Sequence, residues 1–206
     1  MRVLVACEFS GIVRRAFRAL GHEAWSCDLL PSEDDSPFHI VGDVMRIRDG
    51  MAGVGGWDLL IAHPPCTDLA VSGARHFAAK IADGRQERAL DFVRHLMRTS
   101  VPRLAIENPI SVISSKIRKP DQIVHPWMFG HPESKATCLW LKGLPKLTET
   151  HNVHTEMMTL TVPERNRVHH MTPGPNRWRE RSRTFEGIAA AMASQWGGLV
   201  EAEKAA

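Results

Sequence analysis

The sequence predicts an α/β domain with a doubly wound, mostly parallel sheet, extending over the whole chain, residues 1–206. Short apolar runs of the kind found in buried strands alternate with longer segments whose apolar residues repeat at helical spacing. Such alternation is typical of a parallel sheet that is covered by helices on both faces. A chain of 206 residues is also long enough for one domain with a sizeable core.

The N-terminal part is expected to contain a strand, a helix ended by Gly21 and two further strands, at 2–7, 12–20, 23–27 and 39–41. Asp28 follows the second strand, and Asp43 follows the third. A strand, a glycine-containing turn, a helix and a strand that ends in an acid form the first half of a nucleotide-binding unit, where the acid binds a ribose. The complete Gly-x-Gly-x-x-Gly pattern is absent, and such aspartates also serve as turn residues or helix caps. Their recurrence at successive strand tips favours a cofactor site.

The stretch 57–73 places a cysteine at the end of a strand. A buried strand is predicted at 58–62, shortly before Pro64, Pro65 and Cys66. Prolines cannot continue a strand ladder, so Cys66 should lie on a stiff loop at the carboxyl end of the strand, where open α/β sheets bind ligands. Polar surroundings there would favour the thiolate and make Cys66 a nucleophile. The alternative is that Cys66 is one more small buried apolar side chain.

A second polar pair is expected at the same edge of the sheet. A helix is predicted at 85–98 and a strand at 102–106, after which Glu107 and Asn108 leave the carboxyl end. The two side chains could simply cap the following turn. A cysteine and a glutamate at neighbouring strand tips instead favour catalysis.

Two further segments complete the predicted domain. The polar stretch between Cys66 and Asp83 is expected to be an active-site loop. A closing helix is predicted at 186–196, because its apolar residues share one face, and Gly197-Gly198 should end it. The tail to Ala206 is expected to fray.

Composition narrows the class of protein. The cysteines Cys7, Cys27, Cys66 and Cys138 show no paired spacing, which argues against a disulfide framework and a zinc ribbon. No apolar run is long enough to span a bilayer, and charge and glycine interrupt the start as they would not in a signal peptide. These features predict a cytoplasmic enzyme with reduced thiols, without a membrane partner.

Positive charge is concentrated late in the chain, although the formal net charge is only +3. Arginines and histidines gather around Trp178, within a short basic region at 142–178 and just after it. Such a region suits phosphate contacts and stacking on nucleic-acid bases. It could equally be a solvated, flexible basic loop. A metal site is not expected, because no histidine or cysteine pair has ligand spacing.

In their order along the chain, the motifs resemble those of the cytosine-5 DNA methyltransferases, a Rossmann-like family that uses S-adenosylmethionine. The Pro-Cys motif of the family matches Pro65-Cys66, and its Glu-Asn-Val motif matches Glu107-Asn108 with Pro109 in place of valine. The remaining matches are Phe9-Ser10-Gly11, Asp28, Gly42-Asp43, the segment from Gly130 to Lys135, and Arg179 to Arg183 followed by Phe185. The ordered set covers nearly the whole chain, and it carries the resemblance more than any single motif does.

The resemblance implies the roles of the site residues. Cys66 would attack carbon 6 of cytosine, Glu107 in its protonated form would act at nitrogen 3, and Asn108 would hold that strand tip. Lys135 takes the place of an arginine that the family keeps near the catalytic loop. S-adenosylmethionine would be bound by Phe9, Gly11, Asp28, Asp43 and Pro64. DNA would be bound by Arg165, Arg167, Trp178, Arg179 and Arg183, with the target base flipped out of the helix.

The chain also departs from the family. The Gln-x-Arg-x-Arg segment has become Glu133, Lys135 and Thr137, and the cofactor turn lacks its second glycine pair. The region 142–178 is too short for a full target-recognition domain, so the chain most resembles small, phage-type members, which would act in the host cytoplasm. Two alternatives stay open: the same chemistry on a free pyrimidine nucleotide, and an inactive cofactor- or DNA-binding partner subunit. A partner protein could supply target specificity.

An amino-methyltransferase is disfavoured, since that chemistry normally needs an aromatic residue where Cys66 stands.

Overall fold

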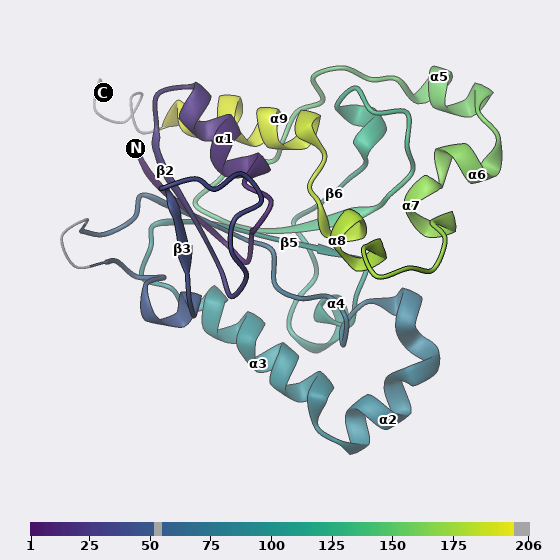
Figure 1. The fold of residues 1–206 in the computed structure, drawn as a ribbon, viewed down its shortest axis with the longest axis horizontal. Helices are drawn as coiled ribbons and strands as arrows, with labels where there is room; N and C mark the ends of the chain where they lie inside the picture. The colour runs from purple at the N-terminus through teal and green to yellow at the C-terminus, as the bar shows by residue number, and fades with distance from the viewer. Residues whose placement is uncertain (52–54, 200–206) are drawn as a thin grey trace.

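The computed structural model describes residues 1–51 and 55–199 of the chain. These residues form a seven-stranded sheet in the order β3-β2-β1-β4-β5-β7-β6 (Figure 1). The strands are β1 Arg2–Ala6, β2 Glu23–Asp28, β3 His39–Val41, β4 Leu59–Ala62, β5 Arg103–Pro109, β6 Gln122–Val124 and β7 Thr137–Lys142. Neighbouring strands from β3 to β5 pair in parallel, whereas β7 is antiparallel to β5 and β6. The predicted α/β fold, doubly wound with a mostly parallel sheet, is confirmed.

Helices cover both faces of this sheet. Because side chains alternate along a strand, β1 sends Val3 and Val5 to one face and Leu4 and Ala6 to the other. The first face packs against α1 Ile12–Ala19 and α9 Glu186–Gly197, and the second against α3 Arg85–Met97 (Figure 1). The sheet is therefore buried on both sides, as a parallel sheet normally is.

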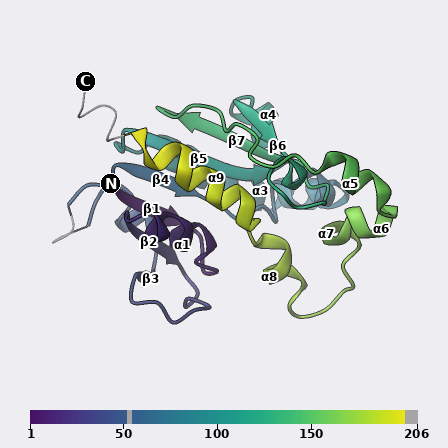
Figure 2. The same ribbon diagram turned by 90° about the horizontal axis from the view of Figure 1, so that it is seen from above.

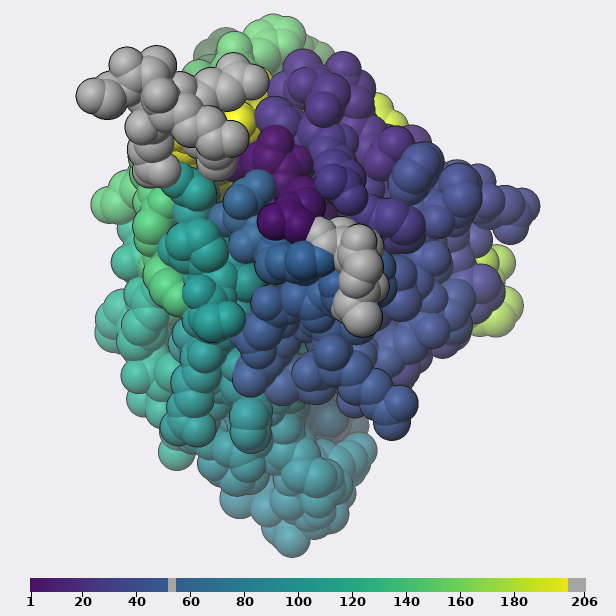
Figure 3. All heavy atoms as spheres, turned by 90° about the vertical axis from the view of Figure 1, so that its left-hand side faces the viewer, coloured from purple at the N-terminus to yellow at the C-terminus, as the bar shows by residue number. Residues whose placement is uncertain are grey.

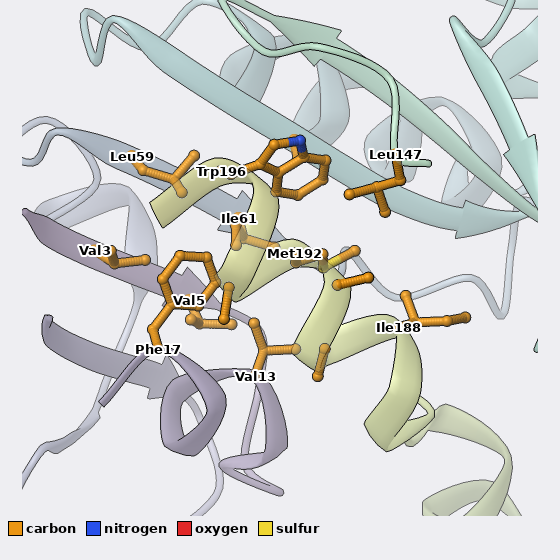
Figure 4. Packing of buried hydrophobic residues seen from close by; sticks show 14 of the residues in the cluster. Val3, Val5, Val13, Phe17, Leu59, Ile61, Leu147, Ile188, Met192 and Trp196 are labelled. Carbon is orange, nitrogen blue, oxygen red and sulfur yellow. The ribbon is translucent and has the colours of Figure 1, made fainter. Parts of the chain in front are cut away.

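The closing helix α9 is the apolar element that the sequence predicts. Met192 and Trp196 are fully buried and lie against the layer formed by β1, β4 and α1 (Figure 4). Trp196 also satisfies its indole nitrogen, because Nε1 donates to the carbonyl oxygen of Pro145 at 3.0 Å. Ala189 and Ala193 are buried as well, and their small side chains allow close packing against α1.

Two segments expected to be loops contain helices. Between Cys66 and Asp83 lie the 3-10 helix η2 Val71–His76 and the helix α2 Phe77–Ala82. The region 142–178 holds α5 His154–Thr159, α6 Val162–Arg165 and α7 Arg167–His170, and runs into α8 Arg177–Ser182. Their polar surfaces hide the helical spacing, because these short helices bury few side chains. The other short helical elements are η1 Val44–Arg46, α4 Ile113–Lys116 and η3 Pro126–Met128.

The helices α5 to α8 gather at one side of the molecule, beyond the first residues of α9 (Figure 2). On the side where the N-terminus lies, the first residues reach the surface between the blue and teal parts of the chain (Figure 3). The expectation for the tail to Ala206 falls on residues outside the described part. Among residues 1–51 and 55–199, no helix combines the length and the apolar character needed to cross a membrane.

Candidate active site and cofactor cavity

A cavity of about 540 Å³ opens where strands β1, β2 and β3 end. Its lining includes Asp28 after β2 and Gly42 and Asp43 after β3, the strand-tip residues that the sequence singles out. The full lining is Cys7, Cys27, Asp28, Leu29, Gly42, Asp43, Val44, Pro65, Asp68, Arg85, Arg88, Ala89 and Phe92. A cavity at the carboxyl ends of parallel strands is the usual ligand position in an open α/β sheet.

The two aspartates also stabilise their own turns. Asp28 Oδ1 accepts a hydrogen bond from the backbone nitrogen of Leu30 at 3.0 Å, and Asp43 Oδ1 accepts one from that of Met45 at 2.9 Å. Burial raises the pKa of Asp28. The geometry is thus compatible with both interpretations of these aspartates, as turn residues and as residues that bind a ligand in the cavity.

Three other residues of the expected cofactor set do not line this cavity. Phe9 packs its ring against Trp178, with 5.6 Å between centroids. Gly11 adopts φ 68° and begins α1 as its N-cap, a conformation that glycine accepts at low cost. Pro64 is buried, and its neighbour Pro65 lines the cavity instead, because the chain turns at the paired prolines.

The opposite wall of the cavity comes from α3. Arg88 and Phe92, four residues apart, share the face of this helix that looks onto the cavity, together with Arg85 and Ala89. Arg85 and Arg88 are exposed, as arginines on the polar face of an amphipathic helix normally are, and they lie at the rim of the cavity. The helical spacing of Arg88 and Phe92 predicts that both lie on one face of the helix, but it does not predict which strand tip that face meets.

Cys66 lies four residues beyond β4 and is half-buried, so it is not a core residue. Its backbone carbonyl accepts hydrogen bonds from the nitrogens of Leu69 at 3.0 Å and Ala70 at 2.8 Å, which fix the turn that carries the thiol. Burial, and then the charge of Glu107, raise the pKa of the Cys66 thiol, whereas Lys135 and Arg181 oppose this shift. The expectation that the strand edge favours the thiolate is therefore wrong, because desolvation outweighs the nearby cations.

Glu107 pairs with a residue that sequence reasoning missed. Its Oε2 lies 2.9 Å from Nδ1 of His63, which follows β4 directly, and both side chains are largely buried. Burial acts to raise the pKa of Glu107, but the hydrogen bond and charge of His63, with Lys135, lower it. Burial acts to lower the pKa of His63, but Glu107 and then Glu8 raise it. The pairing with His63 therefore favours the Glu107 carboxylate, which corrects the expectation of a protonated Glu107.

Asn108 joins the ends of strands β4 and β5, where the candidate site lies. Its side chain is buried, and Nδ2 donates to the carbonyl oxygen of Pro64 at 2.8 Å. The bond ties the end of β5 to the loop that carries Cys66 two residues later. Asn108 Oδ1 is buried without a hydrogen-bond partner in the described part of the chain. The predicted positioning role of Asn108 is compatible with this contact.

Two buried polar side chains anchor the loop after Cys66, and neither was singled out from sequence. Lys80 of α2 is 7% exposed, donates to the carbonyl oxygen of Thr67, and lies 3.4 Å from Asp68 Oδ1. Gln86 of α3 donates to the carbonyl oxygen of Asp68 at 3.3 Å. A lysine on a short polar segment gives no sequence signal, because its partner is a backbone atom.

Positive side chains reach the site from the C-terminal part. Lys135 Nζ donates to the carbonyl oxygen of Arg181 at 3.1 Å, and its ammonium lies 5.7 Å from the centre of the Phe185 ring. Burial, followed by the charges of Arg181 and Lys135, lowers the pKa of His169. The structure thus brings Lys135 near Cys66 and Glu107, and it adds Arg181, which sequence reasoning did not single out.

The residues expected to bind nucleic acid differ in their exposure and in whether they already form ion pairs. Arg183 and Arg179 pair with Glu33, at 2.8 and 3.5 Å, and Arg167 pairs with Glu133 at 2.7 Å. Trp178 is 52% exposed although one side packs on Phe9. Arg165 contacts the sulfur of Met158 at 3.5 Å. Arg179 and Arg183 therefore have a structural role here, joining α8 to the loop before β3.

A smaller cavity of about 340 Å³ lies beside α8. It is lined by Pro173, Gly174, Arg177, Trp178 and Arg181. Arg181 thus connects this cavity with the surroundings of Cys66. Across residues 1–51 and 55–199, no group of three or more histidine, cysteine, aspartate or glutamate side chains is placed to hold a metal ion.

Among comparisons with known proteins, the one with solved structures finds similar chains. No protein-family model matches the chain, and no curated protein matches it. One of the similar chains comes from the crystal structure of an E. coli protein described as a "putative DNA modification methyltransferase encoded within prophage". Its sequence is 15% identical to this chain, and the two structures superpose with a TM-score of 0.46. The match covers 68% of this chain and 46% of that one, so this chain spans less than half the length of that protein.

Proposed function

We propose that the protein transfers a methyl group from S-adenosylmethionine to carbon 5 of cytosine in DNA, through a covalent bond to Cys66. The observation that carries the proposal is the meeting of three features at one sheet edge. The Cys66 thiol lies within the electrostatic influence of Glu107, and the residue before it, Pro65, lines the 540 Å³ cavity. A nucleophile, an acid–base group and a cofactor-sized cavity are what this chemistry requires.

The cavity has the donors and acceptors that S-adenosylmethionine would need. Asp28 and Asp43 offer carboxylate oxygens for ribose hydroxyls and the adenine amine, and Phe92 offers an apolar surface. The cofactor would supply a methyl group on a positively charged sulfur. At about 540 Å³, the cavity falls within the range of small-ligand sites.

The side chains around Cys66 would carry the remaining steps. Carbon 5 of cytosine is a poor nucleophile until the Cys66 sulfur bonds to carbon 6 and turns the ring into an enamine-like centre. Lys135 and Arg181 would stabilise the thiolate, because both lower the pKa that burial raises. Glu107 would act at ring nitrogen 3, where electron density builds up. After transfer, a water molecule in the site would take the carbon 5 proton, the double bond between carbons 5 and 6 would re-form, and Cys66 would leave as the thiolate.

DNA is the favoured substrate because of where the charge lies. Residues 161–185 contain six arginines and two glutamates, a formal charge of +4, whereas the whole chain carries +3. The remainder is therefore close to neutral, and the basic region lies next to the proposed site through Arg181. Such a region binds DNA phosphates whatever the base sequence of the DNA. A free pyrimidine nucleotide remains the second candidate, since the region is too short for a full target-recognition domain.

Incubation with methyl-labelled S-adenosylmethionine and either duplex DNA or free cytidine nucleotides tests this proposal. After digestion, the label should be found in 5-methyldeoxycytidine from the DNA. Label on a free nucleotide alone would support the second candidate. Label on the exocyclic amine, or no transfer to either substrate, would contradict cytosine-5 chemistry.

A further inference from the structure

His63 and Glu107 form a pair of buried titratable groups beside the proposed nucleophile. Nδ1 of His63 is 2.9 Å from Oε2 of Glu107, and the side chains are 9% and 13% exposed. His63 lies at the carboxyl end of β4, three residues before Cys66, and Glu107 lies on the neighbouring strand β5. The pair therefore connects the two strand tips on which the reaction depends.

Charged groups face His63 from three sides. Glu107 comes from β5, Glu8 from the turn after β1, and Lys135 from the segment before β7. The Glu8 carboxylate is already held in place, because Oε1 accepts from the backbone nitrogen of Val13 at 2.6 Å and Oε2 from that of Arg14 at 3.3 Å. Burial raises the pKa of Glu8, whereas His63 and these two hydrogen bonds lower it. When Glu8 is ionised, its charge therefore acts on His63 from a position that α1 fixes.

The other nitrogen of the imidazole ring, Nε2, is unpaired in the described part of the chain. Nε2 of His63 is buried and has no hydrogen-bond partner among the described residues. An unsatisfied buried polar atom costs free energy, and a buried ion pair is seldom a gain in stability over apolar packing. A buried pair of this kind next to a nucleophile fits a role in catalysis better than a role in folding.

We infer that His63 is a positioning residue that stores, next to Glu107, the proton which Glu107 presents to the pyrimidine ring. The inference rests on the proposed function for the identity of the ring atom. It goes beyond that function in assigning the source of the proton to this chain rather than to bulk water.

The proton balance is as follows. Without substrate, the pair holds one proton on Nδ1 of His63, and Glu107 is a carboxylate. Cys66 first gives its own thiol proton to solvent water. As the thiolate sulfur bonds to carbon 6 and the double bond between carbons 5 and 6 opens, the proton passes from Nδ1 to the carboxylate of Glu107, and Glu107 gives it to ring nitrogen 3. His63 is then neutral and Glu107 is again a carboxylate. When the bond to Cys66 breaks, the same proton returns from nitrogen 3 through Glu107 to His63.

The variant His63→Asn separates proton storage from hydrogen bonding. The asparagine amide can donate to Glu107 from near the position of Nδ1, but it cannot release a proton. We expect kcat of the variant to fall at a lower pH than kcat of the wild type. The high-pH limb of the profile should shift down by at least about one pH unit, because Glu107 alone must then hold the proton. KM for DNA should stay unchanged. An unshifted high-pH limb of the profile would overturn the inference, even if the overall rate falls.

A second measurement needs no catalysis. Nitrogen-15 NMR of the ligand-free wild type, labelled at histidine, should show His63 as an imidazolium at a pH well above the usual titration range of histidine, near 6.5. The signals missing from His63→Asn identify this residue, or those altered in Glu107→Gln if the first variant does not fold. A neutral His63 at pH 6 would overturn the inference. Absence of methyl transfer by a wild type that passes this NMR test would overturn the proposed function instead.

Discussion

At the scale of single residues, Asp28 offers a direct test of the cofactor cavity. The substitution Asp28→Asn keeps an oxygen that can accept from the nitrogen of Leu30, so the turn should persist. It removes the charge that would bind a ribose hydroxyl. We expect the free energy of S-adenosylmethionine binding to weaken by about 1–3 kcal/mol in isothermal titration calorimetry. Asp91→Asn, on the exposed side of α3, is the matched control, and equal affinity in both variants would exclude Asp28 from the site.

Lys80 tests whether the loop after Cys66 must be held in place. Lys80→Met keeps most of the side-chain volume but removes the bond to the carbonyl of Thr67. Because small displacements of a reacting group are costly, we expect kcat to fall at least about tenfold while cofactor affinity is retained. The exposed Lys146→Met is the control. Single-turnover rates that match in the two variants would show that the anchor is dispensable.

Sequence reasoning at this scale found the groups with recognisable chemistry and missed their partners. Cys66, Glu107, Asp28 and Asp43 could be predicted because a strand tip is a position that local sequence reveals. His63 could not be assigned, since its role depends on a residue 44 positions away in the chain. The protonation states of Cys66 and Glu107 were predicted wrongly, because burial changes a pKa through surroundings that only the fold supplies.

At the scale of elements, α9 crosses the chain closely at Gly187. A Cβ at this position would lie 1.8 Å from the carbonyl oxygen of Phe129, which is backbone and cannot easily move. We expect Gly187→Ala to lower the free energy of unfolding by about 1–3 kcal/mol, measured by urea denaturation. Gly198→Ala is the control, because nothing lies within 4 Å of its added Cβ. Equal midpoints for the two variants would contradict the close approach.

Prediction of the elements succeeded where one face is continuously apolar. The strands β1, β2, β4 and β5 and the helices α1, α3 and α9 follow from their apolar residues, because these elements bury most or one face of their side chains. The short strand β3 was also predicted, although its side chains are only partly buried. The helices α2 and α5 to α8 were expected as loops. They are short and mostly exposed, and their packing partners lie elsewhere in the chain, so local periodicity carries little information about them.

At the scale of the whole molecule, the uneven charge predicts how DNA binding responds to salt. The affinity for duplex DNA should fall steeply with salt concentration, because binding phosphates releases counterions. Arg165→Ala should reduce the slope of log K against log salt by about one, for all DNA sequences alike. Arg167→Ala should reduce it less, since Glu133 already pairs with that arginine.

The control for this series is Arg94→Ala, because Arg94 lies on α3 and pairs with Glu87 and Asp91. Fluorescence anisotropy at several salt concentrations gives the slopes. A slope that is the same for Arg165→Ala and Arg94→Ala would place the DNA away from the basic region. Cofactor affinity should not change in any of these variants.

The covalent bond between Cys66 and cytosine is tested most directly by mass spectrometry of the protein after incubation with S-adenosylmethionine and duplex DNA that contains 5-fluorocytosine. Fluorine cannot leave carbon 5 as a proton would, so the reaction should stop with the base attached to the enzyme. We expect one adduct, mapped to the peptide that contains Cys66, which persists in Cys138→Ser and is lost in Cys66→Ser. An adduct on another cysteine, an adduct that survives Cys66→Ser, or methyl transfer to normal DNA without any trapped complex would contradict the proposed chemistry.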